Sequence, residues 1–290
     1  MAPVPARGES PVDAWAVPAR GTGRVRSSAM THAAGTGTHS SSDVRNSDVS
    51  WSEFDSIAYW KHNYRTLHEN DGQIIRAVGK FFVECFDGSA APAVAHSVDV
   101  GSGANLYPAL TALPWSRHIT LTDYAEPNIA WLRHNVSDQN GPWAWQPFWD
   151  ELGDLPAYAS VASPRKALAE RHKVEQTSVF DLPQRRWGLG TMFFVAESIT
   201  SDYAEFELAM LRFLEALTPR APFACAFMSG SEGYDVGPSW FPAVDITDQD
   251  VRDLLSTKAV NLDVQQFKTE KPLREGYESM ILALGRVDLG

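Results

Sequence analysis

Residues 98–103, Val-Asp-Val-Gly-Ser-Gly, constrain the fold of this chain more than any other segment. They end an apolar run that starts at Val94, and residues 106–113 after them have helical spacing. Glycine adopts backbone conformations that other residues avoid, and it lets a ligand approach the main chain closely. A strand, a glycine turn and a helix in this order are typical of α/β sheets that bind a ligand at the strand ends, although the third glycine of the dinucleotide fingerprint is absent. The alternative is a tight strand-to-helix turn with no ligand.

Apolar spacing predicts that helices and strands alternate from Trp51 onward. We expect helices over residues 52–63, 71–86, 106–113, 166–172, 203–217 and 247–256, and one that begins at Pro127. We expect strands over residues 94–100, 119–121, 174–180, 191–196, 223–228, 260–267 and 279–284. This order predicts an α/β fold: a Rossmann-like seven-stranded sheet, mostly parallel with an antiparallel C-terminal strand, helices on both faces and an N-terminal helical cap.

Two segments depart from this pattern. Residues 1–48 are rich in Gly, Ser, Thr, Ala and Pro, with too little apolar mass to offset the entropy of ordering. We therefore expect a disordered tail over 1–48 and one domain over 49–290. Residues 141–165 contain the cluster Trp143, Trp145, Phe148 and Trp149, which suggests an insertion that packs as a lid or flap.

Composition excludes several classes of protein. The chain has 25 Lys and Arg against 36 Asp and Glu, a net charge of −11, which argues against binding nucleic acid through phosphate neutralisation. Two cysteines, Cys85 and Cys225, cannot form a disulfide scaffold, so we expect a reduced, cytoplasmic environment. No apolar run approaches the roughly 18–20 residues of a membrane span. The histidines lack the spacing of metal ligands, so no metal is expected.

A second chemical signal follows the glycine turn. Asp123 ends the next predicted strand, about 20 residues later, where an acidic side chain can accept hydrogen bonds from both hydroxyls of a ribose. The alternative for Asp123 is a cap of the helix that begins near Pro127. The glycine turn before it favours ribose binding.

Three segments together resemble the class I S-adenosylmethionine-dependent methyltransferases, and among them the nicotinamide, phenylethanolamine and indolethylamine N-methyltransferases. They are residues 59–64, residues 98–107 and residues 121–124 with Asn128. The resemblance implies S-adenosylmethionine as cofactor and a cap whose tyrosines, Tyr59 and Tyr64, close over it. It implies cofactor contacts at Tyr59, Tyr64, Gly101, Ser102, Gly103, Tyr107, Asp123, Tyr124, Asn128, Ser178 and Val179. In this assignment Tyr107 contacts the methionine carboxylate and Tyr124 lies beside the adenine.

The sequence departs from the family near the third strand. The family has an Asp-Val pair there, which holds the adenine amine, whereas residues 176–181 read Gln-Thr-Ser-Val-Phe-Asp. Either Ser178 replaces that aspartate, or Asp181 acts from a shifted position.

The substrate side is less constrained by motif. Glu197 follows the fourth predicted strand and resembles the acidic residue that the phenylethanolamine enzyme places near its substrate amine, which would make it the catalytic group. A carboxylate there can orient an amine and accept its proton, and the alternative is a solvated helix cap. Other candidate substrate contacts are Trp60, Ser231, Glu232 and Tyr234. Trp60, Trp143, Trp145 and Trp240 would form an aromatic wall, or simply pack in the core.

These features favour an enzyme that methylates a small molecule at an amine or heterocyclic nitrogen. Two alternatives stay open: methylation at oxygen, on a hydroxyl or a carboxylate, and a non-catalytic protein that binds S-adenosylmethionine. The expected partner is a small-molecule methyl acceptor, with no nucleic acid and no membrane. The expected assembly is a monomer or a homodimer.

Overall fold

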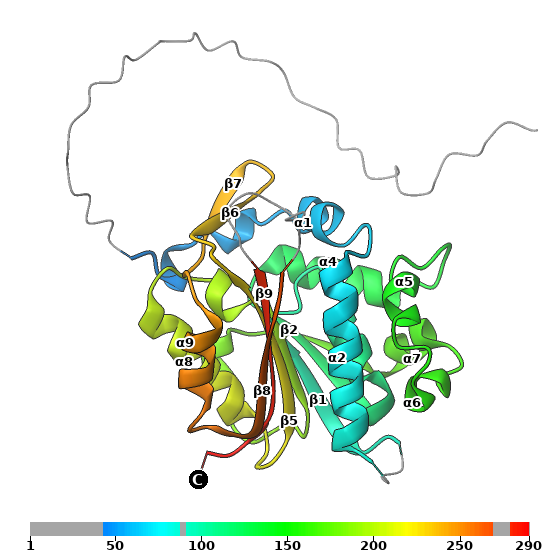
Figure 1. Cartoon of the computed structure of the whole chain (residues 1–290). Coiled ribbons are helices and arrows are strands. Elements are labelled where there is room, and N and C mark those ends of the chain that lie inside the picture. The colour runs from blue at the N-terminus through cyan, green and yellow to red at the C-terminus, as the bar shows by residue number, and fades with distance from the viewer. Residues whose placement is uncertain (1–42, 88–90, 269–278, 290) are drawn as a thin grey trace, which may run out of the picture. The chain divides into compact units, whose positions relative to one another are not determined.

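The folded domain begins earlier than its composition indicates. The computed structural model of the protein describes residues 43–87, 91–268 and 279–289 (Figure 1). Its compact unit starts at Asp43, so the predicted boundary after residue 48 falls inside that unit. The predicted tail over residues 1–42 lies outside the described residues.

A central sheet of seven strands confirms the expected fold class. Its strands are β1 (Val94–Val100), β2 (Ser116–Asp123), β3 (His172–Gln176), β4 (Gly190–Phe193), β5 (Pro222–Ser229), β8 (Ala259–Phe267) and β9 (Ser279–Val287). The spatial order is β3-β2-β1-β4-β5-β9-β8. Neighbours from β3 to β5 pair in parallel, and β9 lies antiparallel between β5 and β8. The predicted C-terminal antiparallel strand is therefore β9.

Helices cover both faces of the sheet (Figure 1). They are α1 (Ser56–Asn63), α2 (Glu69–Cys85), α3 (Tyr107–Ala112), α4 (Glu126–Ser137), α5 (Gln146–Asp150), α6 (Pro156–Ala159), α7 (Pro164–Arg171), α8 (Tyr203–Ala216) and α9 (Asp248–Leu255). Short 3₁₀ turns lie at Asn46–Asp48, Trp51–Glu53, Leu113–Trp115, Val179–Asp181 and Ala196–Ser198.

Alternation along β5 shows how the sheet forms two cores. Ala224 and Ala226 point into the core shared with α2 to α7, whereas Phe223, Cys225 and Phe227 point into the core shared with α8 and α9. Side chains of a strand alternate between faces, so a continuous apolar strand buries both sides. All eight positions of β5 are buried, as this requires.

The Trp-rich segment is part of the core, so the expectation of a lid over 141–165 is wrong. Trp145, Phe148 and Trp149 are buried, and Phe148 stacks on Tyr107 with ring centroids 5.7 Å apart. Tyr158 of α6 is fully buried and donates a hydrogen bond of 2.7 Å to the carbonyl of Thr111. Burial of this apolar mass stabilises the segment against α3.

Two predicted strands are shorter than expected, and a small hairpin was not predicted. The segment 174–180 leaves the sheet after Gln176, and 191–196 leaves it after Phe193. The second departure coincides with Phe194, whose φ of 59° is left-handed and ends the extended run. The hairpin of β6 (Gly233–Val236) and β7 (Ser239–Pro242) packs near α1 through Phe54 and Tyr234.

Candidate active site

The turn after β1 has the conformation that its glycines predict. Gly101 and Gly103 have φ of 63° and 53°, in the left-handed region. A Cβ at Gly101 would lie 2.5 Å from a methyl carbon of Val195, so any larger residue there must displace its neighbour. The Ser102 amide donates to the Thr122 carbonyl at 2.8 Å, which ties the turn to β2. This hydrogen bond to β2 fixes the main chain of the turn at the edge of the sheet.

Asp123 is held against this turn by main-chain donors. Its Oδ2 accepts from the Gly103 amide at 2.9 Å, and its Oδ1 accepts from the Ala125 amide at 2.8 Å. The Asn128 side chain is a further donor, and Asn128 itself accepts from Ser56 of α1 at 2.6 Å. Burial raises the pKa of Asp123 to about 6, while these hydrogen bonds act to lower it. The carboxylate both shapes the start of α4 and faces the cavity described next.

A cavity of about 90 Å³ lies at the carboxyl ends of the parallel strands. Its walls contain these sequence-predicted residues: Tyr59, Tyr64, Gly101, Ser102, Gly103, Asp123, Tyr124, Asn128, Ser178, Val179 and Tyr234. Predicted residues from five separate segments of the chain therefore meet around one space.

Of the two candidates for the position of the family's aspartate, Ser178 and Asp181, only Ser178 lines the cavity. Thr177, Ser178 and Val179 line the cavity, whereas Asp181 lies outside the described lining. The Ser178 hydroxyl accepts from the Phe180 amide at 3.2 Å and so caps the short turn that follows. Ser178 therefore lies at the cavity wall, and its role in place of the family's aspartate stays a prediction.

Tyr107 lies behind the wall rather than in it. Its ring is buried and meets Tyr64 edge-on, with centroids 5.9 Å apart. Its hydroxyl donates to the Asp71 carboxylate at 3.0 Å. In this arrangement the Tyr107 hydroxyl donates its proton to Asp71, so that proton is not available for the predicted contact with a cofactor carboxylate.

Several predicted substrate residues do not line the cavity in the described structure. Trp60 is half-buried against the core, Ser231 donates to the Gly233 carbonyl at 3.3 Å, and Glu232 is exposed. Trp240 is 55% exposed, with its ring over Gly233. The aromatic wall expected from these tryptophans does not form, because Trp143 and Trp145 belong to the core near α5.

Glu197 is inside the protein rather than at the surface of the cavity. It is fully buried, and its Oε1 accepts from the Met228 amide at 3.0 Å and from the Ser198 hydroxyl at 3.2 Å. Its carbonyl accepts from the Val244 amide at 2.8 Å. Ser198, the next residue, does line the cavity, and its carbonyl accepts from Tyr234. Glu197 thus supports the cavity wall from inside the protein and does not itself line the cavity.

We expect Glu197→Ala to destabilise the fold by about 2–4 kcal/mol, because it leaves the buried Met228 amide without an acceptor and opens a cavity. Glu197→Gln keeps an acceptor and should retain most of the stability. Both variants should bind donor nearly as the wild type does and turn over more slowly, which urea denaturation and steady-state kinetics would measure. A loss of donor affinity as large as the loss of turnover would contradict this role.

An N-terminal strap, residues 43–54, closes one side of the cavity and was missed by sequence reasoning. Asn46, Trp51 and Phe54 line the cavity. The signal available was the aromatic pair Trp51 and Phe54, which directly follows the Ser-rich segment. Its small size and the neighbouring low-complexity composition hid it.

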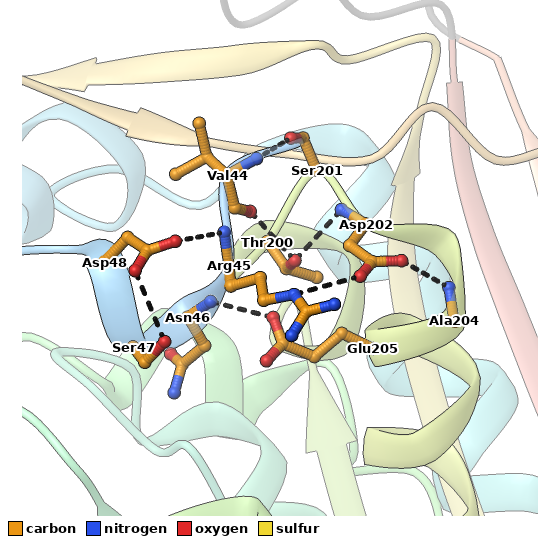
Figure 2. Close-up of polar contacts among 10 residues, drawn as sticks. All are labelled: Val44, Arg45, Asn46, Ser47, Asp48, Thr200, Ser201, Asp202, Ala204 and Glu205. Carbon is orange, nitrogen blue, oxygen red and sulfur yellow. Dashed lines mark hydrogen bonds and ion pairs between the residues drawn. The ribbon is translucent and has the colours of Figure 1, made fainter. Parts of the chain in front are cut away.

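Polar contacts fasten the strap to the loop before α8 and to the first turn of α8 (Figure 2). The Val44 amide donates to the Ser201 hydroxyl at 2.7 Å, and the Val44 carbonyl accepts from Thr200 at 3.0 Å. The Asn46 amide donates to the Glu205 carboxylate at 2.7 Å. Main-chain groups of the strap make most of these contacts. They leave no side-chain pattern from which the strap could be predicted.

Three buried carboxyl groups near the cavity have raised pKa values. Burial raises the pKa of Asp71 and of Asp99 to about 7, and that of Asp123 to about 6. The unfolded chain holds these protons only below about pH 4. Between that value and neutrality the folded protein binds more protons than the unfolded chain, so stability falls as pH rises.

We therefore expect the ligand-free protein to have a higher free energy of unfolding at about pH 5.5 than at about pH 8. Asp99→Asn should reduce this difference, because the amide cannot ionise. Urea denaturation of both proteins at the two pH values measures it. A wild-type stability that is flat or rises over this range would contradict the prediction.

Within residues 43–87, 91–268 and 279–289, no group of three or more His, Cys, Asp or Glu side chains could hold a metal ion. None of the helices in the same described ranges is long and apolar enough to span a bilayer.

Comparison with known proteins identifies the family. The sequence model of the NNMT/PNMT/TEMT family matches residues 44–280. Nicotinamide N-methyltransferase of Homo sapiens is 27% identical over 141 residues, which are 47% of this chain and 52% of the human protein. The Sus scrofa enzyme of the same name is 27% identical over 133 residues, 45% of this chain and 48% of its own. The chain thus spans about half the length of the curated relatives it matches.

Solved structures of similar fold include 1,6-didemethyltoxoflavin-N1-methyltransferase of Burkholderia thailandensis, with bound 1,6-didemethyltoxoflavin and S-adenosylhomocysteine. It is 15% identical, with a TM-score of 0.46, over 75% of this chain and 79% of that protein. The family match covers most of the present chain and includes every element that forms the cavity. The resemblance seen in the glycine turn and in Asp123 is thereby confirmed, and the chain belongs to the NNMT/PNMT/TEMT family.

Proposed function

We propose that this protein transfers a methyl group from S-adenosylmethionine to a nitrogen of a small-molecule acceptor. The observation that carries the proposal is the Asp123 carboxylate, fixed by the Gly103 amide at the edge of an open cavity. Family membership supports it as well.

The residues present fit the parts of this cofactor. Asp123 would accept hydrogen bonds from the ribose hydroxyls, since a carboxylate can accept two. Tyr124 and residues 177–179 would enclose the adenine, and the Gly101 to Gly103 turn would lie along the methionyl chain. When bound, the cofactor supplies an electrophilic methyl group on a positively charged sulfur.

The other end of the cavity would hold the acceptor. Trp51, Phe54, Tyr59 and Tyr234 provide aromatic surface there, and Asn46 and Ser198 provide polar groups. Phe241 packs behind this end, stacked on Trp51 and Tyr234 with centroid distances of 5.3 and 5.7 Å. A rigid aromatic wall excludes water and holds a planar acceptor at a short distance from the donor, which accounts for much of the rate in such transfers.

A binding and turnover experiment tests the proposal. Titration calorimetry with S-adenosylmethionine and S-adenosylhomocysteine should show binding to the full chain. A product assay over amines, nitrogen heterocycles, phenols and carboxylic acids should then show methylation of nitrogen compounds. Methylated oxygen products would replace the nitrogen assignment, and binding without turnover of any acceptor would favour a non-catalytic role. If the protein binds neither S-adenosylmethionine nor S-adenosylhomocysteine, the proposal is wrong.

Assembly and partners belong to the same proposal. We expect the protein to act on free small molecules, without nucleic acid, as a monomer or a homodimer. The net charge of −11 supports the exclusion of nucleic acid. Light scattering of the purified chain measures its mass in solution and distinguishes the two assemblies.

A further inference from the structure

One polar group of the strap is left unused by the folded protein at the wall of the cavity. Asn46 lines the cavity and is half-buried. Its main-chain amide donates to the Glu205 carboxylate at 2.7 Å (Figure 2). Its main-chain carbonyl and its side-chain Oδ1 both accept from the Trp51 indole, at 3.2 and 3.0 Å. Among residues 43–87, 91–268 and 279–289, the side-chain NH₂ group of Asn46 has no hydrogen-bond partner.

The contact with Trp51 fixes the orientation of this NH₂ group. The oxygen and nitrogen of a side-chain amide lie in one plane, so a hydrogen bond to Oδ1 also sets the position of Nδ2. Trp51 is itself held, because its ring stacks on the buried Phe241 with centroids 5.3 Å apart and an interplanar angle of 25°. Little rotational freedom is then left for Asn46 to lose when a ligand binds, which favours affinity.

The order of the strands places Asn46 away from the predicted ribose contact. Strand β1, with the glycine turn at its end, lies between β2 and β4. Asp123 ends β2, whereas Ser198, which lines the cavity, follows β4 on the other side of the turn. Val44 of the strap is bonded to Ser201, three residues after Ser198. Asn46 therefore lies toward the end of the cavity that the proposed function assigns to the methyl acceptor.

The chemistry of this end selects a particular kind of molecule. An amide NH₂ group donates hydrogen bonds, so its complement on a ligand is an oxygen or nitrogen with a free lone pair. The aromatic rings of Trp51 and Phe54 line the same part of the wall and favour a planar ligand. The Glu205 carboxylate, which is bonded to the Asn46 amide, disfavours a second negative charge nearby. An uncharged carbonyl oxygen satisfies these three conditions.

We propose that Asn46 is a specificity-determining residue, and that the methyl acceptor is a planar nitrogen heterocycle with an uncharged carbonyl group whose oxygen accepts from the Asn46 NH₂ group. The inference rests on the proposed function and deepens it by naming a class of substrate and the residue that recognises it. A site built to hydrogen-bond a substrate group discriminates against the analogue that lacks this group, because its polar atom is then left unpaired.

Matched pairs of heterocycles test the inference. The probes are acetylpyridine with ethylpyridine and acetylquinoline with ethylquinoline, each pair substituted at the same ring carbon. The members of a pair have nearly the same shape and differ by a carbonyl in place of a methylene group. Titration calorimetry of the full chain, saturated with S-adenosylhomocysteine so that no turnover occurs, measures their affinities. The wild type should bind the acetyl member of a pair about three- to tenfold more tightly than the ethyl member.

Two substitutions of Asn46 remove the hydrogen-bond donor in different ways. Asn46→Asp keeps an oxygen that can accept from Trp51 but has no NH₂ group. Asn46→Ala removes the whole amide and adds no charge. Both variants should lose the preference for the acetyl member, so that the affinity ratio within a pair falls to about one or below. Both should bind S-adenosylhomocysteine as the wild type does, because Asn46 lies away from the ribose contact.

Two further variants separate recognition of the carbonyl from attachment of the strap. Ser47→Ala removes an exposed hydroxyl from the next position in the strap and should keep the wild-type preference. Ser201→Ala removes the acceptor of the Val44 amide and should loosen the strap. It should weaken both members of a pair by the same factor and leave their ratio unchanged. A purely structural role of Asn46 would give that same result in Asn46→Ala.

The outcomes are distinguishable from those of the proposed function. The inference is overturned, and methyl transfer left standing, if wild-type protein that binds S-adenosylhomocysteine binds none of these heterocycles or shows no preference for the acetyl member in either pair. A preference that persists in Asn46→Ala also overturns it, since another group then recognises the carbonyl. A wild-type protein that binds neither S-adenosylmethionine nor S-adenosylhomocysteine overturns the proposed function itself.

Discussion

Asp123→Ala should weaken the binding of S-adenosylmethionine by about 10- to 150-fold, the equivalent of about 1.5–3 kcal/mol for hydrogen bonds to a charged group. The carboxylate would accept from the ribose, and the same group already accepts from the Gly103 and Ala125 amides. Its removal therefore loses a ligand contact and loosens the glycine turn at once. Titration calorimetry at neutral pH measures the effect.

The matched control for this substitution is Glu126→Ala, three residues further along. Glu126 is an exposed acid in the first turn of α4 and does not line the cavity. It should bind donor as the wild type does. Because Asp123→Ala also lowers stability, thermal unfolding of each variant shows whether the titrated protein is folded. Donor binding by folded Asp123→Ala at wild-type strength would refute the ribose assignment.

Gly101→Ala should abolish measurable donor binding and lower the stability of the domain. The residue has a φ of 63°, which costs about 1–2 kcal/mol for a residue with a Cβ. The added methyl group would also lie 2.5 and 2.7 Å from the two methyl carbons of Val195, so β1 or the segment after β4 must move. Movement of either displaces the floor of the cavity. Calorimetry and urea denaturation measure the two effects.

Gly141→Ala is the matched control, since it isolates backbone strain from the steric clash. Gly141 has a nearly identical φ of 65°, but a Cβ there would meet nothing within 4 Å. It should lose about 1 kcal/mol of stability and keep full donor affinity. Equal losses in the two variants would show that the close approach of Val195 to the turn has no part in binding.

Local patterns predicted the strands and helices well where each element has its own period. The apolar run of β5 and the helical spacing of Ile74, Ile75, Val78 and Phe82 in α2 both place buried residues where the structure has them. The glycine turn and Asp123 were also predictable, because the residue types are dictated by main-chain geometry within a few residues.

Prediction failed where a residue's surroundings come from distant segments. Glu197 has the residue type and position of a substrate contact. In the structure the Met228 amide donates to its carboxylate and the Val244 amide donates to its carbonyl, and Glu197 lies in the interior. The tryptophans of 141–165 have the composition of a lid, but the side of α3 facing them is apolar and buries them. In both examples the contacting segments are distant in the sequence, so no local sequence pattern predicts the burial.

By itself, the sequence determined the β-α order, the left-handed turn at Gly101 and Gly103, and a carboxylate one strand later. These follow from steric limits and periodicity, which act over a few neighbouring residues. Only the tertiary structure decided that the strap at 43–54 closes the cavity, that Glu197 lies behind its wall, and that Asp71 is buried against Tyr107. Those outcomes depend on burial and hydrogen bonding between segments that meet only when the chain is folded, because desolvation is set by the complete set of neighbours.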